Sequence, residues 1–299
     1  MASSPTREIT DADETGSESE RRSIAWMLFS IVLYATNVLL LRAVARHAAA
    51  ADAAVATAFR GAIGLLLVGA VFGGRGLQAK HLLRHPLVLA RGAVGGMAIL
   101  LFYLTIPRLG AGRAVILNLT YPVFAAVMAA LWIGEPLARR QLIWMLVSLT
   151  GLAVFLGADA LRPGAITWEA VGIVGAVLAG GAVVLIRQLR HTEHPSTVYA
   201  SQCLWSLAVT APWWPGALGQ LSIPVMSALA AAALLVGIAQ LAMTHAFRSL
   251  SVARGSSLQM LLPLLTTMGG LAFFDERLTP IEIAGAILTL WGTALAVRR

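Results

Sequence analysis

Residues 109–137 read LGAGRAVILNLTYPVFAAVMAALWIGEPL, and residues 250–278 read LSVARGSSLQMLLPLLTTMGGLAFFDERL. A shift of 141 positions aligns the two stretches without a gap and places Asn118 opposite the similar Gln259. Matches of charged residues and proline carry more weight than matches of leucine, because leucine and alanine are abundant in this chain. The sequence therefore predicts an internal repeat. The identical pairs are Leu109 and Leu250, Arg113 and Arg254, Pro122 and Pro263, Glu135 and Glu276, Leu137 and Leu278, and Gly151 and Gly292.

The composition indicates a membrane protein. Of the 299 residues, 58% are hydrophobic and 12% are charged, against about 25% charged residues in an ordinary soluble domain. The sequence contains ten apolar segments, each able to cross a hydrocarbon layer of about 30 Å as a helix, and they lack the alternation of barrel strands. These segments span residues 24–41, 51–72, 88–107, 112–133, 141–158, 168–186, 196–214, 225–247, 253–274 and 280–297.

The repeat and the segments together predict the architecture. Each half holds five helices, an odd number, so the second half enters the membrane in the opposite orientation to the first. We expect an all-α membrane protein with ten transmembrane helices, arranged as two five-helix inverted repeats around a central cavity. The expected parts are a disordered cytoplasmic tail over residues 1–22, a first repeat over residues 23–158 and a second repeat over residues 166–299.

Basic residues predict the orientation and argue against other classes of protein. With both termini in the cytoplasm, 15 of the 22 lysines and arginines, Arg91 and Arg254 among them, fall in inside loops and tails, as the positive-inside rule requires. Because they do not form a stripe, no nucleic-acid partner is expected. The single cysteine, Cys203, allows no intrachain disulfide. No acid/base pair or ligand set lies at one depth, so we expect no enzyme activity, metal or cofactor.

Short motifs resemble the drug/metabolite transporter superfamily, and specifically its EamA-type ten-helix members. Residues 109–137 show that family's small residue and arginine, its central proline and its closing Gly-Glu. LYATNVLL keeps the family's asparagine at Asn37 but departs from its pattern at residues 34–35, and AFRGAIGLLL keeps an arginine at Arg60. The resemblance covers about residues 24–297. It implies ten helices around a cavity, transport of metabolites, often outward, and a bacterial cytoplasmic (inner) membrane, but no particular substrate.

Arg60 is the first candidate site residue, because it lies near the middle of the segment 51–72. An arginine at the centre of a membrane helix costs at least about 2.5–3.5 kcal/mol, so it should face protein or a wet cavity. Arg60 either recognises an anionic or carbonyl group of a substrate, or it is a structural arginine that bonds helix-end carbonyls or snorkels to the surface.

Polar side chains inside other apolar segments complete the candidate site. Asn118 and Gln259 are related by the repeat, which favours a shared cavity, whereas hydrogen bonding between helices is the alternative for any buried amide. Gln202 and Gln240 are further buried polar candidates. The predicted substrate-binding residues are Asn37, Arg60, Asn118, Tyr121 and Gln259.

Two prolines and two glutamates are predicted to have gating or structural roles. Pro122 and Pro263 are expected to lie within helices, where the missing N–H bends the segment into a gate or a packing kink. Glu135 and Glu276 are expected at helix ends, where they cap neighbouring helix N-termini or form gating contacts between the halves.

The expected function is that of a secondary transporter. The two halves would rock about the fourth and ninth helices and move a small polar or zwitterionic, amino-acid-like metabolite by alternating access, with export favoured over import. Because one chain carries both halves, we expect a monomer or a homodimer whose partners are the lipid bilayer and a small-molecule substrate. The alternative is a non-transporting membrane protein that acts as an assembly partner or an intramembrane enzyme.

Overall fold

A computed structural model describes residues 5–45, 53–72, 77–109, 114, 117–155, 166–213, 222–274 and 278–298. Within these ranges the regular structure is helical and contains no strand, as the sequence predicted. The elements in chain order are α1 (Pro5–Ala45), α2 (Ala53–Phe72), α3 (Ala79–Arg84), α4 (Pro86–Leu109), α6 (Tyr121–Trp132), α7 (Arg139–Phe155), α8 (Ile166–Leu189), α9 (Pro195–Thr210), the 3₁₀ turn η2 (Ala211–Trp213), α11 (Ile223–Ala246), α12 (Val252–Gln259), α13 (Leu262–Phe274) and α14 (Pro280–Val297).

Seven of the described helical stretches are long and apolar enough to cross a membrane. The sequence predicted ten, so the ten-helix layout remains a prediction. The stretches that do not qualify are shorter than the about 20 residues that a membrane span needs: α6 has 12 residues, α9 has 16 and the described part of α7 has 17. In addition, α7 begins with two arginines and α9 contains several Ser and Thr residues. Most of α9 is buried, and a helix enclosed by other helices does not need an apolar surface. The seven spans are Glu18–Leu40, Ala54–Phe72, Pro86–Thr105, Thr167–Leu189, Ile223–Ala246, Val252–Phe273 and Pro280–Val297.

The outer surface of the bundle carries large apolar side chains, and its interior, although mostly hydrophobic, also contains many polar side chains. Leu131, Phe273 and Trp291 expose 76%, 78% and 66% of their surface. Several Ser, Thr and Gln side chains and one arginine are buried instead. Water as solvent opposes this distribution, because exposed apolar surface is unfavourable in water and buried polar groups need partners. The distribution is typical of a helical protein in lipid.

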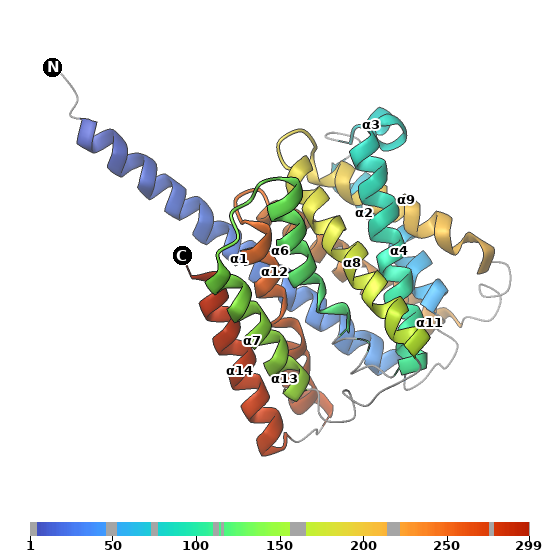
Figure 1. The fold of residues 1–299 in the computed structure, drawn as a ribbon. Helices are drawn as coiled ribbons and strands as arrows, with labels where there is room; N and C mark the ends of the chain where they lie inside the picture. The colour runs from blue at the N-terminus through green and yellow to red at the C-terminus, as the bar shows by residue number, and fades with distance from the viewer. Residues whose placement is uncertain are drawn as a thin grey trace.

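The helices pack in two similar groups around the centre of the molecule. In one group α1 packs on α11, and in the other α8 packs on α4, while α2 and α9 contact each other and link the groups. Figure 1 shows α7 and α14 side by side at one edge of the bundle. Together the groups enclose the space in which the candidate site lies.

Small residues bring α7 and α14 into backbone contact. A Cβ atom added at Gly151 would lie 2.5 Å from the backbone nitrogen of Thr289, and one added at Gly292 would lie 2.6 Å from that of Ser148. At the same crossing, Ser148 Oγ lies 2.8 Å from Thr293 Oγ1 and donates to the carbonyl oxygen of Thr289 at 3.1 Å. Close approach and interhelical hydrogen bonds hold membrane helices together where burial of apolar surface cannot.

The N-terminal region differs from its prediction. The sequence suggested a disordered tail over residues 1–22, but α1 is helical from Pro5, and Figure 1 shows this part projecting from the bundle. Proline suits the first turn of a helix, because the N–H that it lacks would have no partner there. Glu20 then pairs with Arg254 in α12, a residue that the sequence analysis placed in a loop.

Both repeat prolines begin helices rather than bending them. Turns at residues 119–120 and 260–261 interrupt two helical stretches, so that α6 starts at Tyr121 and α13 starts at Leu262. Pro122 and Pro263 are therefore the second residues of their helices, whereas the sequence predicted mid-helix kinks. Proline lacks the N–H that a helix interior uses, and the first turn is where that loss costs least.

Candidate functional site

A cavity of about 430 Å³ lies inside the bundle, within the range of about 300–1,000 Å³ that is typical of small-molecule sites. Its walls come from α1, α2, α4, α6, α8, α9, α11, α12 and α13. Apolar side chains cover much of the wall, and a limited set of polar groups converges on the same space. The polar side chains that line it are Tyr34, Asn37, Arg60, Arg91, Tyr103, Asn118, Tyr121, Gln202, Gln240 and Gln259.

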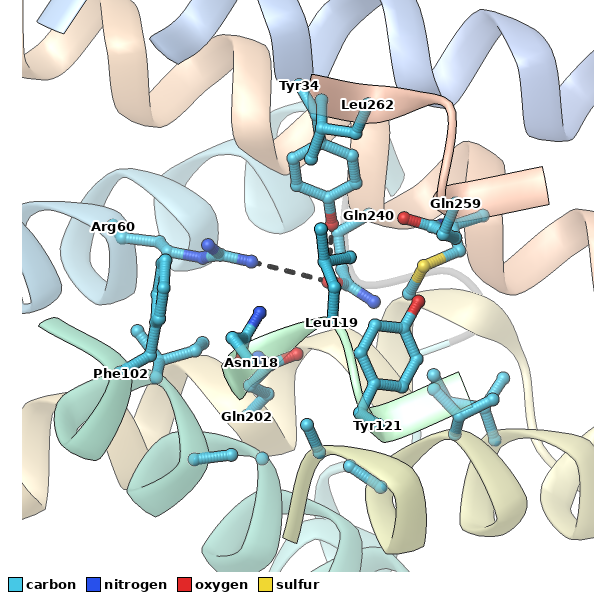
Figure 2. A pocket seen from close by; sticks show the side chains of 18 of the residues that line it. Tyr34, Arg60, Phe102, Asn118, Leu119, Tyr121, Gln202, Gln240, Gln259 and Leu262 are labelled. Carbon is cyan, nitrogen blue, oxygen red and sulfur yellow. Dashed lines mark hydrogen bonds between the residues drawn. The ribbon is translucent and has the colours of Figure 1, made fainter. Parts of the chain in front are cut away.

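The tertiary structure brings together all five residues that the sequence predicted to bind substrate. Asn37 lies on α1, Arg60 on α2, Asn118 just before α6, Tyr121 at the start of α6 and Gln259 at the end of α12. Figure 2 shows Arg60 reaching in from one side of the cavity, with Tyr121 and Gln259 on the other. One small molecule could therefore contact several of them at once.

The interrupted helices explain why three of these residues face the cavity. Asn118 and Gln259 are the last helical residues before the two breaks, and Tyr121 is the first residue after one of them. A break turns side chains and backbone groups at the ends of both segments toward the same space. Irregular backbone at membrane depth is tolerated where it lines a cavity or is buried in protein.

Arg60 has neutral partners inside the cavity. Gln240 Oε1 accepts a hydrogen bond from the Tyr34 hydroxyl at 2.8 Å and a longer one from Arg60 Nη2 at 3.4 Å. The Arg60 guanidinium carbon also lies 6.0 Å from the centre of the Tyr34 ring, a distance at which cation–π attraction operates. Arg60 Nε is buried and has no hydrogen-bond partner among the described residues. The arginine thus faces protein and cavity, as its depth in the membrane requires.

Arg91 lines the cavity, whereas it was predicted among the arginines of the cytoplasmic loops. It lies in the second turn of α4 and is 2% exposed. Its Nη2 donates to Gln202 Oε1 at 2.8 Å, while its Nε and Nη1 find no hydrogen-bond partner in the described part of the chain. The predicted segment 88–107 already contained Arg91, and α4 begins two residues before that segment, at Pro86. The RGAVGG run that starts at Arg91 was the available signal, because glycines beside an arginine leave room for its side chain.

Glycines on α4 position the Arg91 side chain. A Cβ atom at Gly95, one turn further along, would collide with Arg91 Nη1, and one at Gly96 would lie 3.0 Å from the backbone nitrogen of Ser206 on α9. The small residues let α9 approach closely, and Ser201 Oγ donates to the Val88 carbonyl oxygen at 2.6 Å. This packing places Gln202 of α9 beside the guanidinium.

Two of the predicted binding amides also have contacts within the protein. Asn37 Nδ2 donates to the carbonyl oxygen of Ala232 at 2.8 Å and so joins α1 to α11. Gln259 Nε2 lies 3.3 Å from the sulfur of Met27, which is a weak acceptor. The Asn37 amide nitrogen therefore forms a hydrogen bond between helices, which was the alternative for buried amides. Gln259 has only a weak acceptor within the protein.

Glu135 lies away from the cavity and joins several helix ends. Its Oε1 lies 2.5 Å from Arg187 Nε, and its Oε2 accepts from the backbone N–H of Val252, the first residue of α12, at 2.8 Å. Arg187 Nη1 also donates to the carbonyl oxygens of Phe247 and Arg248 just after α11. The carboxylate thus caps α12 and ties it to α8. Its repeat counterpart, Glu276, lies outside the described residues.

Comparison with known proteins places this cavity in a family context. The model of the EamA-like transporter family matches residues 21–157 and again residues 166–298. An uncharacterized protein of Pseudomonas aeruginosa is 30% identical over 285 residues, which cover 92% of this chain and 94% of that protein. A protein of known crystal structure, 21% identical, superposes with a TM-score of 0.74 over 92% of this chain and 96% of its own, so it shares the fold.

Two further relatives have named activities. The pseudopaline exporter CntI of Pseudomonas aeruginosa strain UCBPP-PA14 is 25% identical over 231 residues, which cover 77% of this chain and 81% of the exporter. The threonine/homoserine exporter RhtA of Escherichia coli K12 is 29% identical over 270 residues, which cover 81% and 82% of the two chains. Both relatives are named as exporters.

Proposed function

Because the chain belongs to the EamA-like transporter family, we propose that it is a secondary transporter that exports a small polar or zwitterionic, amino-acid-like metabolite by alternating access. The expected kinship with the drug/metabolite transporter superfamily is confirmed. Family and apolar helices together support a multi-pass protein of a bacterial inner membrane, and they point to a transporter rather than an enzyme. The observation that carries the proposal is the cavity inside the bundle, where polar groups from both parts of the chain meet.

We also propose the ten-helix inverted repeat, with residues 23–158 and 166–299 as its halves. The shift of 141 positions that aligns the sequence also relates the starts of α6 and α13, at residues 121 and 262, and of α7 and α14, at residues 139 and 280. The α7–α14 crossing also supports the inverted repeat. Gly151 packs on Thr289 and Gly292 packs on Ser148, and the same shift relates both the glycines and their partners. Such reciprocal contacts are what a two-fold axis between similar halves produces.

Alternating access needs elements that move between two arrangements. The broken helices at residues 119–120 and 260–261 end at the cavity, so movement there would open or close it. We propose that Pro122 and Pro263 set these break points and that Glu135, with Arg187, holds α12 to α8 in one of the states. Both termini are proposed to lie in the cytoplasm, and a single chain, which carries both halves, suffices for transport.

The proposed binding site consists of Asn37, Arg60, Asn118, Tyr121 and Gln259, with Arg91 added by the structure. Amides, hydroxyls and guanidinium groups suit the polar groups of an amino-acid-like compound. The exporter relatives support this substrate class and the outward direction. The family and its exporter relatives favour transport over the rival role of intramembrane enzyme.

Flux in proteoliposomes tests the proposal. Purified protein is reconstituted and offered labelled amino acids, nucleosides, vitamins and organic ions, with unlabelled substrate on the opposite side. Saturable flux that rises with substrate on the opposite side is expected from a carrier, and Arg60→Ala and Asn118→Ala should reduce it. Arg140→Ala, an exposed arginine at the start of α7, is the matched control and should leave flux unchanged. Correctly inserted protein that moves none of these compounds would contradict the proposal and favour an assembly role.

A further inference from the structure

The cavity has an unbalanced charge. Two of the described side chains that line it are cationic, Arg60 and Arg91, and none of them is an aspartate or glutamate. Arginine stays protonated in proteins, so both guanidinium groups are charged. Buried charges are normally paired with an opposite charge, because desolvation is costly otherwise. The described cavity wall does not supply that opposite charge.

The hydrogen bonds of the two arginines show the same imbalance. Arg91 is almost fully buried, yet its one acceptor is the neutral amide oxygen of Gln202, and its Nε and Nη1 remain without a partner among the described residues. Arg60 meets the neutral Gln240 and Tyr34, and its Nε also lacks a partner within the described ranges. Anionic oxygens form the strongest hydrogen bonds with guanidinium donors. The free donors are therefore suited to an anion that enters the cavity.

The positive charge comes from one half of the molecule. Arg60 lies on α2 and Arg91 on α4, both in the first half. A shift of 141 positions leads from them to Ser201 and Ala232 in the second half, which are neutral. The cavity is thus polarised, and an asymmetric ligand would bind with its charged end toward α2 and α4. The wall supplied by α8 is apolar, and consists of Ala179, Ala182, Val183 and Ile186.

We infer that the transported compound is a small organic anion with more negative than positive charge, whose carboxylate is bound by Arg91, with Arg60 as the second cation, and whose apolar part faces α8. This inference rests on the proposed transport function and narrows its substrate class. A simple zwitterion fits less well, because its ammonium group would meet two cations and no carboxylate among the described lining residues.

Ligand-dependent stability of the purified protein tests the charge preference without requiring transport. The probes are succinate, glutarate and phenylsuccinate, each paired with its neutral diamide, and threonine as the zwitterion. A ligand that binds only the folded protein raises its melting temperature with concentration. We expect saturable stabilisation by at least one dicarboxylate and none by its diamide at equal concentration. Dicarboxylates that stabilise no better than the diamides or threonine would overturn the inference.

Variants assign the effect to Arg91. Arg91→Gln should weaken the apparent affinity for the dicarboxylate about 10- to 100-fold, which corresponds to the loss of a charged hydrogen bond, whereas Arg91→Lys should keep part of it. Arg140→Gln is the matched control and should bind as the wild type does. Unchanged affinity in Arg91→Gln would overturn the assignment. If Arg91→Gln does not fold, Arg60→Gln replaces it, and the acid-against-amide comparison on the wild type stands by itself.

Counterflow of the same probes separates this inference from the proposed function. Dicarboxylate binding together with counterflow supports both. Dicarboxylate binding without flux of any compound contradicts the transporter proposal but keeps the anion site. Flux of threonine or neutral compounds in preference to dicarboxylates keeps the transporter and overturns the anion site.

Discussion

The α7–α14 crossing and the central cavity both bury polar side chains, but those at the crossing are hydrogen-bonded and several donors in the cavity are not. At the crossing, Ser148 bonds to Thr293 and to the Thr289 carbonyl, and Thr289 Oγ1 donates to the carbonyl of Gly285. In the cavity, donors on Arg60 and Arg91 have no partner among the described residues. Buried polar groups in proteins are nearly always paired, so the exceptions require an explanation. Paired groups stabilise the bundle at the crossing, whereas the unpaired donors of Arg60 and Arg91 lie at the proposed ligand site.

The largest effect is expected at the crossing. Gly151→Leu would force side-chain atoms into the backbone of Thr289, whose nitrogen lies 2.5 Å from the position that a Cβ atom would take, so the two helices must separate. We expect a loss of about 3 kcal/mol in the free energy of unfolding, the upper part of the range for overpacking. Thermal unfolding in detergent measures it. Gly69→Leu is the control, because no atom lies within 4 Å of that Cβ. Equal stability of the two variants would show that the crossing is loosely packed.

The Glu135→Ala variant tests whether a fully paired charge stabilises the fold. Both of its oxygens have partners, Arg187 and the N–H of Val252, so Glu135→Ala should lower the free energy of unfolding by about 2 kcal/mol, as expected for charged hydrogen bonds. Glu18→Ala, exposed on α1, serves as the control. An altered transport rate with an unchanged melting temperature would contradict this role in stability and leave only the contact proposed for one of the transport states.

The Gly95→Ala variant tests whether a glycine of the cavity wall positions the Arg91 guanidinium. The new methyl group would displace the Arg91 guanidinium, which can move because it ends a flexible side chain. We expect about fivefold weaker substrate affinity, equivalent to about 1 kcal/mol. Stability should be unchanged or higher, because alanine favours a helix by about 1 kcal/mol over glycine. Gly181→Ala on α8, where the nearest atom is 3.8 Å away, is the control. Lower stability with normal affinity would show that Gly95 is needed for packing and not for the position of the Arg91 guanidinium in the binding site.

The smallest effect is expected from a single hydroxyl at the crossing. Ser148→Ala removes the bonds to Thr293 and to the Thr289 carbonyl and should cost about 0.6 kcal/mol, the average for hydrogen bonds between membrane helices. Transport should be unaffected. Thr150→Ala, whose exposed hydroxyl bonds only within its own helix, is the control. A marked loss of flux would show that the crossing takes part in the transport cycle.

Helix positions were largely predictable from the sequence. The predicted segment 280–297 coincides with α14, and the segments 51–72 and 225–247 agree with α2 and α11 to within two residues. The length of an apolar segment indicates whether it can span the membrane, and a flanking proline indicates where the helix begins. The breaks before Pro122 and Pro263 were not predicted, because the same proline can either bend a helix or start one, and the choice depends on the space around it.

The cavity was predicted only in part. Asn37, Arg60, Asn118, Tyr121 and Gln259 stood out because polar residues are rare inside apolar segments. The partners of these residues did not stand out, because a hydrogen bond between helices leaves no periodic pattern. Gln240 lies 180 positions from Arg60 along the chain, and the amide of Asn37 bonds a backbone carbonyl 195 positions away.

The sequence by itself determined an all-helical membrane protein and predicted an internal repeat, because apolar length and recurring residues are properties of the chain alone. Only the tertiary structure decided that Arg91 lies inside the cavity. Near a helix end an arginine can reach the membrane surface or turn inward, and the local sequence does not distinguish these. The close packing of α9 on the glycines of α4 turns Arg91 inward and brings Gln202 to it. The position of a charge therefore depended on contacts between helices that are distant in the sequence.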